Sequence, residues 1–90
     1  MPRNPPRPDP AETRARLDAL YADIAAGLPV GEAVRRMRQI SGLTQPEFAR
    51  HRGISVQALR QIESGRGNPT VKTLDAIAGV FGLKTGFVPR

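Results

Sequence analysis

The stretch of the chain between residues 43 and 65 contains the side chains whose chemistry is most informative. Gln57 and Gln61 are four residues apart on one predicted helix, so their side chains share a face. An amide side chain donates and accepts hydrogen bonds in one plane, which matches the N6 and N7 edge of adenine, and the methyl groups of Val56 match the methyl group of thymine. The same glutamines, taken alone, also fit a helix face that meets only water.

The distribution of charge points to a polyanionic partner. The 90 residues carry a formal net charge of +6, and the sequence pI is about 11.3. Residues 1–28 hold four Arg and four Asp or Glu, whereas residues 29–90 hold the other ten basic and four acidic residues. A basic excess confined to one part predicts a nucleic-acid partner, with solubility as the alternative. Arg50 and Arg52 are interpreted as solvated or peripheral, and His51 as an exposed residue at a helix end.

Residue types that other functions require are missing from the sequence. The chain has no Cys, which excludes a disulfide framework and a Cys nucleophile, and its single histidine, His51, excludes a multi-histidine metal site. It has no phosphate-binding glycine loop and no clustered carboxylate pair, so we expect no enzyme, no cofactor and no metal. No apolar run approaches the roughly 18 residues of a membrane span, and the N-terminus lacks the apolar core of a signal peptide. These features predict a cytoplasmic, nucleoid-associated protein without a membrane partner.

Five predicted helices must position these side chains. Asp9 with Glu12 forms a capping-box pattern at the start of the first helix, and Thr44 with Glu47 forms another at the start of the third, while Ser55 caps the fourth. The apolar stripe of the first helix is expected to pack on the following domain or on a second subunit. The five helices are predicted over residues 9–28, 29–41, 44 to the break at Gly53, 55–64 and 70–81. The apolar residues expected to face the core include Val30 and Val71.

The two ends of the chain are predicted to differ. Residues 1–8 contain four prolines and are expected to form a disordered arm, whose Arg3 and Arg7 either reach a minor groove or have no role. In residues 83–90, Leu83, Thr85 and Phe87 alternate with Lys84, Gly86 and Val88, which is the pattern of a short strand. In a chain with no other strand, the expected partner is the same strand of a second copy, which predicts a two-fold homodimer. The residues assigned to this dimerisation strand are Leu83, Thr85, Phe87 and Val88; the alternative is a disordered terminus with Phe87 tucked on the core.

Two short helices joined by a tight turn containing Gly53 form a helix-turn-helix, whose second helix enters the DNA major groove. Residues 30–82 resemble the helix-turn-helix family of phage repressors and Cro, called XRE-type. The ordered run LTQ, EFA, GIS, IESG, NPT and TL carries the resemblance. It implies an all-α, repressor-like domain over residues 29–82, with double-stranded DNA as the partner, and the extra N-terminal helix at 9–28 completes a five-helix fold.

The resemblance also implies roles for individual side chains. The residues expected to contact bases are Val56, Gln57, Arg60 and Gln61. Those expected to contact phosphates are Thr44, Gln45, Ser55, Ser64, Arg66 and Asn68, and Gln45 is also expected to brace the recognition helix. Arg38 and Glu63 form the expected structural ion pair. The chain departs from the family pattern at Val56, where a polar residue is common, and at Pro46, which removes an amide that could meet a phosphate.

Two function classes follow from this resemblance. The first is a dimeric, sequence-specific transcriptional repressor that binds a palindromic operator and regulates its own operon. The second is an antitoxin, because small XRE-type proteins that end in a strand resemble HipB-type antitoxins, in which one protein neutralises a toxin and co-represses the operon. In that case the arm and the first helix are the expected toxin-binding part. RNA binding and a coactivator-like bridge are further alternatives.

Overall fold

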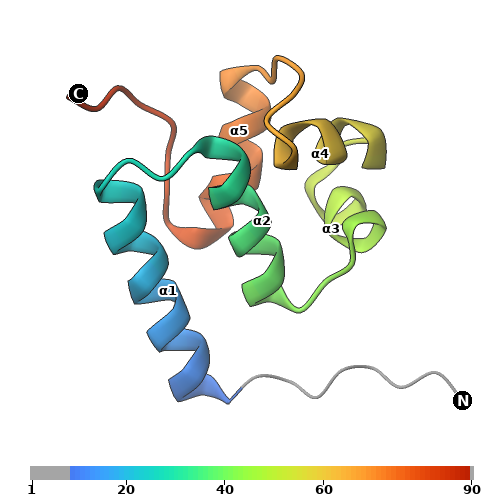
Figure 1. Ribbon diagram of the computed structural model, residues 1–90. Coiled ribbons are helices and arrows are strands. Elements are labelled where there is room, and N and C mark those ends of the chain that lie inside the picture. The colour runs from blue at the N-terminus through green and yellow to red at the C-terminus, as the bar shows by residue number, and fades with distance from the viewer. Residues whose placement is uncertain (1–8, 90) are drawn as a thin grey trace, which may run out of the picture.

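The computed structural model describes residues 9–89, which form five α-helices and one 3₁₀-helix. Their bounds are α1 Pro10–Ala25, α2 Val30–Ser41, α3 Gln45–Arg52, α4 Val56–Glu63, α5 Val71–Ala78 and η1 Gly79–Phe81. Figure 1 shows α2 in the middle of the molecule, with α1 on one side of it and α3 and α4 on the other. None of the helices in this described part combines the length and apolar content needed to cross a bilayer. The proline-rich arm predicted at residues 1–8 lies outside the described residues.

Local capping chemistry sets most helix boundaries. Thr44 and Glu47 form the predicted reciprocal capping box at the start of α3, and the Ser55 side chain accepts a hydrogen bond from the Ala58 amide at the start of α4. The box predicted at the start of α1 is not formed. The Asp9 side chain instead accepts a hydrogen bond from the amide of Ala11. Glu12 forms an ion pair with Arg16, one turn further along α1.

One hydrophobic core joins all five α-helices. Leu20, Phe48, Leu59 and Ile77 are its largest fully buried side chains, and they come from α1, α3, α4 and α5. The remaining buried apolar residues are Ala33, Val34, Met37, Ala49, Ile62 and Ala78. Because Leu20 belongs to this core, the apolar stripe of α1 packs within its own chain, which decides between the two predicted alternatives.

Polar contacts also hold α1 in place. The Tyr21 hydroxyl donates to the carbonyl oxygen of Phe81 at 2.6 Å, which ties α1 to η1. Asp23 forms an ion pair with Arg36 on α2. These contacts reach both neighbours of α1, so the helix is integrated into the domain.

Two valines predicted to face inward do not. Val30 is 54% exposed and Val71 is 60% exposed. Each valine is the first residue of its helix and lies beyond the part of the helix that packs on the core. Helical spacing alone does not indicate where that packing ends.

The predicted C-terminal strand is absent from the described part of the chain. Helix α5 ends at Ala78, the next turn is the 3₁₀-helix η1, and residues 83–89 have no regular structure. A strand needs a partner for its backbone groups, and a single copy of this chain supplies none. Leu83 packs against the core and the Thr85 amide donates to Asp75 Oδ1 at 2.8 Å, while Phe87 and Val88 are exposed. The strand prediction, and the alternative of Phe87 on the core, are therefore wrong for the isolated chain, and the homodimer stays a prediction.

Candidate nucleic-acid interface

Helices α3 and α4 pack against each other through small and apolar side chains. Ala49 is 2% exposed and Leu59 is fully buried, so the two helices cross closely. The turn between them passes through Gly53 at φ 69°, a left-handed conformation that glycine adopts without steric cost. The Ile54 amide then donates to the Ala49 carbonyl at 3.0 Å, which closes the end of α3. This is the predicted helix-turn-helix geometry.

Helix α4 divides its side chains between two faces. Leu59, Ile62 and Glu63 are buried. Gln57, Arg60 and Gln61 are exposed on the other side of the helix. Val56 is half-buried and packs against the core, so only part of its side chain is available to a ligand. The structure thus places three of the four predicted base-contacting residues in solvent.

The base of this face is a buried ion pair. Glu63 is 7% exposed, and its two carboxylate oxygens accept hydrogen bonds from Nε and Nη2 of Arg38 at 2.8 and 3.0 Å. The third nitrogen of the Arg38 guanidinium, Nη1, donates to the Leu43 carbonyl at 3.2 Å. The hydrogen bond to Glu63 raises the pKa of Arg38 above its ordinary value, so the guanidinium keeps its charge at neutral pH. The pair joins α2 to the C-terminal end of α4.

Gln45 extends this polar network to the surface. Its Nε2 donates to Glu63 at 3.3 Å, and its Oε1 accepts from Nε of Arg60 at 3.3 Å. Both partners belong to α4, so Gln45 braces this helix as expected, although Arg60 was not predicted as its partner. No fixed spacing relates residues that are 15 positions apart on different helices, so only the tertiary packing of α3 on α4 brings them together.

The predicted phosphate contacts surround this face, and several already have partners. The Thr44 hydroxyl donates to Glu47 at 2.9 Å, and the Ser64 hydroxyl donates to the Gln61 carbonyl at 3.0 Å. The Ser55 hydroxyl caps α4. Arg66 and Asn68 are exposed in the loop between α4 and α5. The structure therefore places all of these residues near the ends of α3 and α4, and their contacts with phosphate remain predictions.

Arg52 corrects one interpretation of the sequence. Its guanidinium lies 4.6 Å from the ring centre of Phe48 and 5.8 Å from that of Phe81, so the side chain is packed rather than freely solvated. Its buried Nε has no hydrogen-bond partner among residues 9–89. The spacing of four residues between Phe48 and Arg52 on one helix is the sequence signal that indicates this contact.

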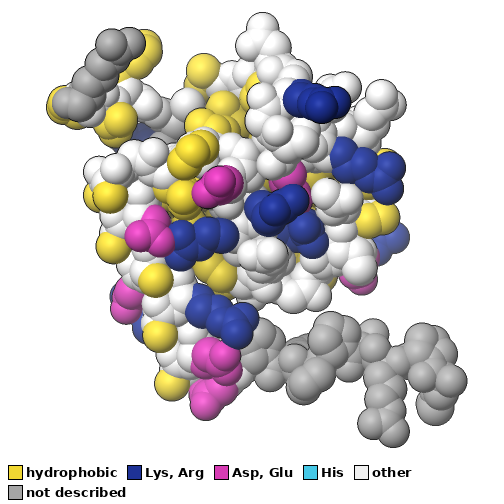
Figure 2. All heavy atoms as spheres, in the orientation of Figure 1, with side chains coloured by type: hydrophobic (Ala, Val, Ile, Leu, Met, Phe, Trp, Pro, Cys, Tyr) yellow, Lys and Arg dark blue, Asp and Glu magenta, His cyan; other side chains and the backbone are white. Residues whose placement is uncertain are grey.

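Charge on the molecular surface is uneven. Figure 2 shows acidic side chains mixed with basic ones along α1, whereas Lys and Arg predominate over the helices on the opposite side of α2. This agrees with the basic excess of residues 29–90. Positive charge on the side that carries α4 favours a polyanion there.

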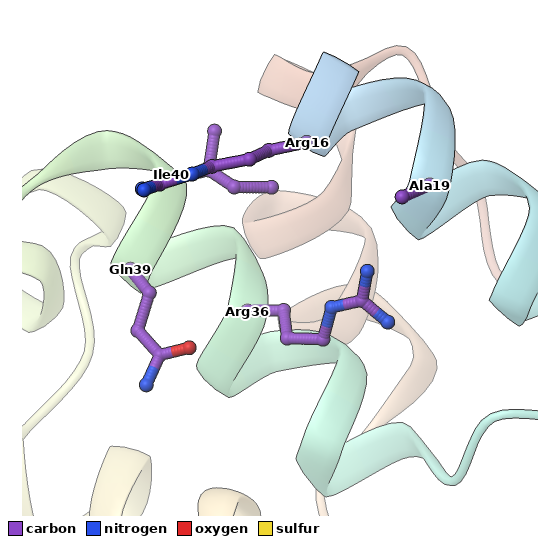
Figure 3. A pocket seen from close by; sticks show the side chains of 5 residues that line it. All are labelled: Arg16, Ala19, Arg36, Gln39 and Ile40. Carbon is purple, nitrogen blue, oxygen red and sulfur yellow. The ribbon is translucent and has the colours of Figure 1, made fainter. Parts of the chain in front are cut away.

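Two shallow grooves flank α2 and α4. One, of about 200 Å³, lies between α1 and α2 and is shown in Figure 3. Its lining residues are Arg16 and Ala19 from α1 and Arg36, Gln39 and Ile40 from α2. The other, of about 220 Å³, runs beside α4 and includes Gln61, Asn68 and Thr70. The second groove is continuous with the exposed face of α4, whereas the first is on the α1 side of the domain.

Comparison with known proteins identifies the family. A family model described as helix-turn-helix matches residues 34–88, which is more than half of the chain. The chain belongs to the helix-turn-helix family. The match includes most of α2 and all of α3 to η1, and it leaves α1 outside. It confirms the resemblance carried by the LTQ to TL run.

Relatives of this helix-turn-helix protein are named as regulators. The chain is 44% identical over 54 residues to an uncharacterized HTH-type transcriptional regulator, y4dJ, of Sinorhizobium fredii, covering 60% of this chain and 70% of the relative. It is 33% identical over 61 residues to an immunity repressor protein of Bacillus phage phi105, covering 68% of this chain and 42% of the relative. It is 38% identical over 52 residues to the HTH-type transcriptional regulator DdrOP3 of Deinococcus deserti, covering 58% and 40%. The chain therefore spans less than half the length of the last two. No solved structure gives a significant match.

Proposed function

We propose that the protein is a sequence-specific DNA-binding transcriptional regulator that represses the promoter it occupies. The observation that carries this proposal is the exposed polar face of α4. Gln57, Arg60 and Gln61 project from a short helix whose other face is anchored by fully buried Leu59 and by Ile62. Amide and guanidinium groups presented on a rigid helix match adenine and guanine edges in the major groove. The names of the relatives, two transcriptional regulators and a phage repressor, support regulation as the outcome of binding.

A homodimer on a palindromic operator is the assembly that suits this face. One α4 reads only a few base pairs, and two copies related by a two-fold axis read two half-sites about one helical turn, roughly 34 Å, apart. Val80, Phe87 and Val88 are exposed apolar side chains near the C-terminal end, and they are the proposed contact with the second copy. A repressor of this kind regulates its own operon when the palindrome lies in its own promoter.

Selection of bound sequences from a random DNA library at near-physiological salt tests the proposal. A palindromic consensus whose half-site centres are about one helical turn apart is the expected result. Enrichment of a single half-site contradicts the dimer, and recovery of unenriched sequences contradicts specific DNA binding. The antitoxin alternative stays a prediction and differs in requiring a toxin protein as partner, which co-expression with the neighbouring gene and copurification test directly.

A further inference from the structure

Gln45 is held by hydrogen bonds at both ends of its side-chain amide. Its Nε2 donates to Oε1 of Glu63 and its Oε1 accepts from Nε of Arg60, both at 3.3 Å. Glu63 is itself fixed, because its side chain is 2% exposed and accepts two hydrogen bonds from Arg38. A continuous hydrogen-bonded chain therefore runs from the interior of the domain to the exposed guanidinium of Arg60.

We infer that Gln45 and Glu63 are positioning residues that aim Arg60 at a guanine, an inference that rests on the proposed DNA-binding function. Because Gln45 occupies Nε of Arg60, the donors left for a ligand are the two terminal amino groups, Nη1 and Nη2. These groups are parallel and coplanar, and they match O6 and N7 of guanine in the major groove. A phosphate contact depends chiefly on charge, which lysine also supplies, so the two ligands are separable by experiment.

Holding the guanidinium before DNA arrives makes binding more selective. A free arginine side chain loses rotamer freedom when it is fixed on a base, and hydrogen bonds already present in the unbound protein remove part of that cost. The side chain of Val56, at the start of α4, has no hydrogen-bonding group, so it does not compete with Arg60 for the side-chain amide of Gln45. Arg60 also lies three residues after Gln57 on the exposed face, so the two side chains face the same side of α4.

The test uses the full chain and DNA duplexes obtained by selection with the wild-type protein. Binding is measured by fluorescence anisotropy for the selected duplex and for duplexes in which one base pair at a time is replaced. The variants are Arg60→Lys, which keeps the charge and loses the planar fork, Gln45→Met, which keeps the size and loses both hydrogen bonds, and the double variant. Gln57→Ala is the control from the same face, and thermal melts confirm that every variant is folded.

We expect wild-type protein to prefer guanine at one position by about tenfold or more. Arg60→Lys should abolish this preference and leave the preferences at the other positions unchanged. Gln45→Met is expected to reduce the same preference by roughly three- to tenfold, and by less than about twofold when Arg60 is already lysine. Gln57→Ala should alter a different base pair.

Several outcomes would overturn this inference while leaving specific DNA binding in place. The first is a guanine preference that survives Arg60→Lys, and the second is a wild-type consensus in which no base depends on Arg60. The third is a loss of affinity on Gln45→Met that is equal at all base pairs. The fourth is a loss of guanine preference on Gln45→Met that is just as large when Arg60 is already lysine. Failure of the wild-type protein to select any sequence refutes the proposed function itself, and the inference with it.

Discussion

A methyl group added at Gly31 would collide with the backbone of α4. The Cβ of Gly31→Ala would lie 2.4 Å from the Ile62 carbonyl oxygen and 3.1 Å from that of Glu63, about 1 Å short of ordinary contact for the nearer one. Both atoms belong to the main chain, so relief requires α4 to move away from α2. Overpacking of this kind costs about 1–3 kcal/mol, and the upper half applies where backbone must shift. Alanine returns at most about 1 kcal/mol through its higher helix propensity. The net loss is therefore about 1–2 kcal/mol.

Thermal unfolding monitored by circular dichroism measures this effect. For a domain of this size, the expected loss lowers Tm by roughly 5–15 °C. Gly79→Ala is the matched control, because Gly79 has helical φ and ψ of −58° and −35° and an added Cβ there meets nothing within 4 Å. The control should therefore leave Tm unchanged or raise it slightly. A Gly31→Ala protein that melts at or above the wild-type temperature would refute the reasoning, since it would show that α2 and α4 separate without cost.

Three further predictions concern the polar residues. Gln57→Ala should weaken binding to the selected operator by about 1–3 kcal/mol and relax one base position, as measured by anisotropy on single-base variants. Glu63→Gln should lower the free energy of unfolding in urea by about 3 kcal/mol, the low end of the range for a broken buried pair, because Arg38 keeps some access to water. Hydrogen bonds from the backbone and side chain of Thr44 lower the pKa of Glu47, so its ionised form supports the fold above the unfolded pKa near 4.5, and this support is lost as the pH falls through the lower folded value. Urea titrations between pH 6 and 3 should therefore show a shallower decline for Glu47→Gln.

The first two predictions have a control variant, and all three have a contradicting result. For Gln57→Ala the control is Gln39→Ala, which removes an exposed glutamine on the α1 side of α2 and should leave operator binding unchanged. Equal losses of affinity for Gln57→Ala on operator and on random DNA would show that Gln57 contacts phosphate instead of a base. Glu32→Gln removes an exposed glutamate from α2, and stability losses that match those of Glu63→Gln would argue against the buried pair. Parallel pH profiles for wild-type and Glu47→Gln would show that the capping box contributes nothing to acid stability.

The features that the sequence predicted well are those decided by local chemistry. Thr44, Ser55 and Gly53 act through amides and carbonyls within a few residues of themselves, so their types and spacing contain the information needed to place α3 and α4. The strand predicted at residues 83–90 is absent from the described residues 83–89, because strand pairing depends on a neighbour that the sequence does not specify. The contact between Gln45 and Arg60 likewise depends on how two helices pack, and no periodicity encodes it.

Helix α1 extends the folding unit beyond the residues that define the family. The family match begins at residue 34, yet the side chain of Leu20 is fully buried in the same core as Leu59 and Ile77. Burial of one leucine contributes roughly 1.5–3 kcal/mol, a large share of the stability of a domain this small. The hydrogen bond from Tyr21 to Phe81 adds a link across the chain. The matched segment alone would therefore expose apolar surface that α1 normally covers.

Glu63 contributes both to the packing of the fold and to the network proposed to orient Arg60. Its carboxylate joins α2 to α4 through Arg38 on one side and reaches the exposed face through Gln45 on the other. A substitution at Glu63 is therefore expected to disturb both the contact between α2 and α4 and the orientation of Arg60, and weaker DNA binding by such a variant does not identify which of them was lost. Gln45 separates the two effects, because replacing it leaves both hydrogen bonds between Arg38 and Glu63 in place while releasing the guanidinium of Arg60. A variant at Gln45 that keeps its melting temperature and loses discrimination at one base pair would therefore locate recognition in the orientation of Arg60 rather than in the stability of the fold.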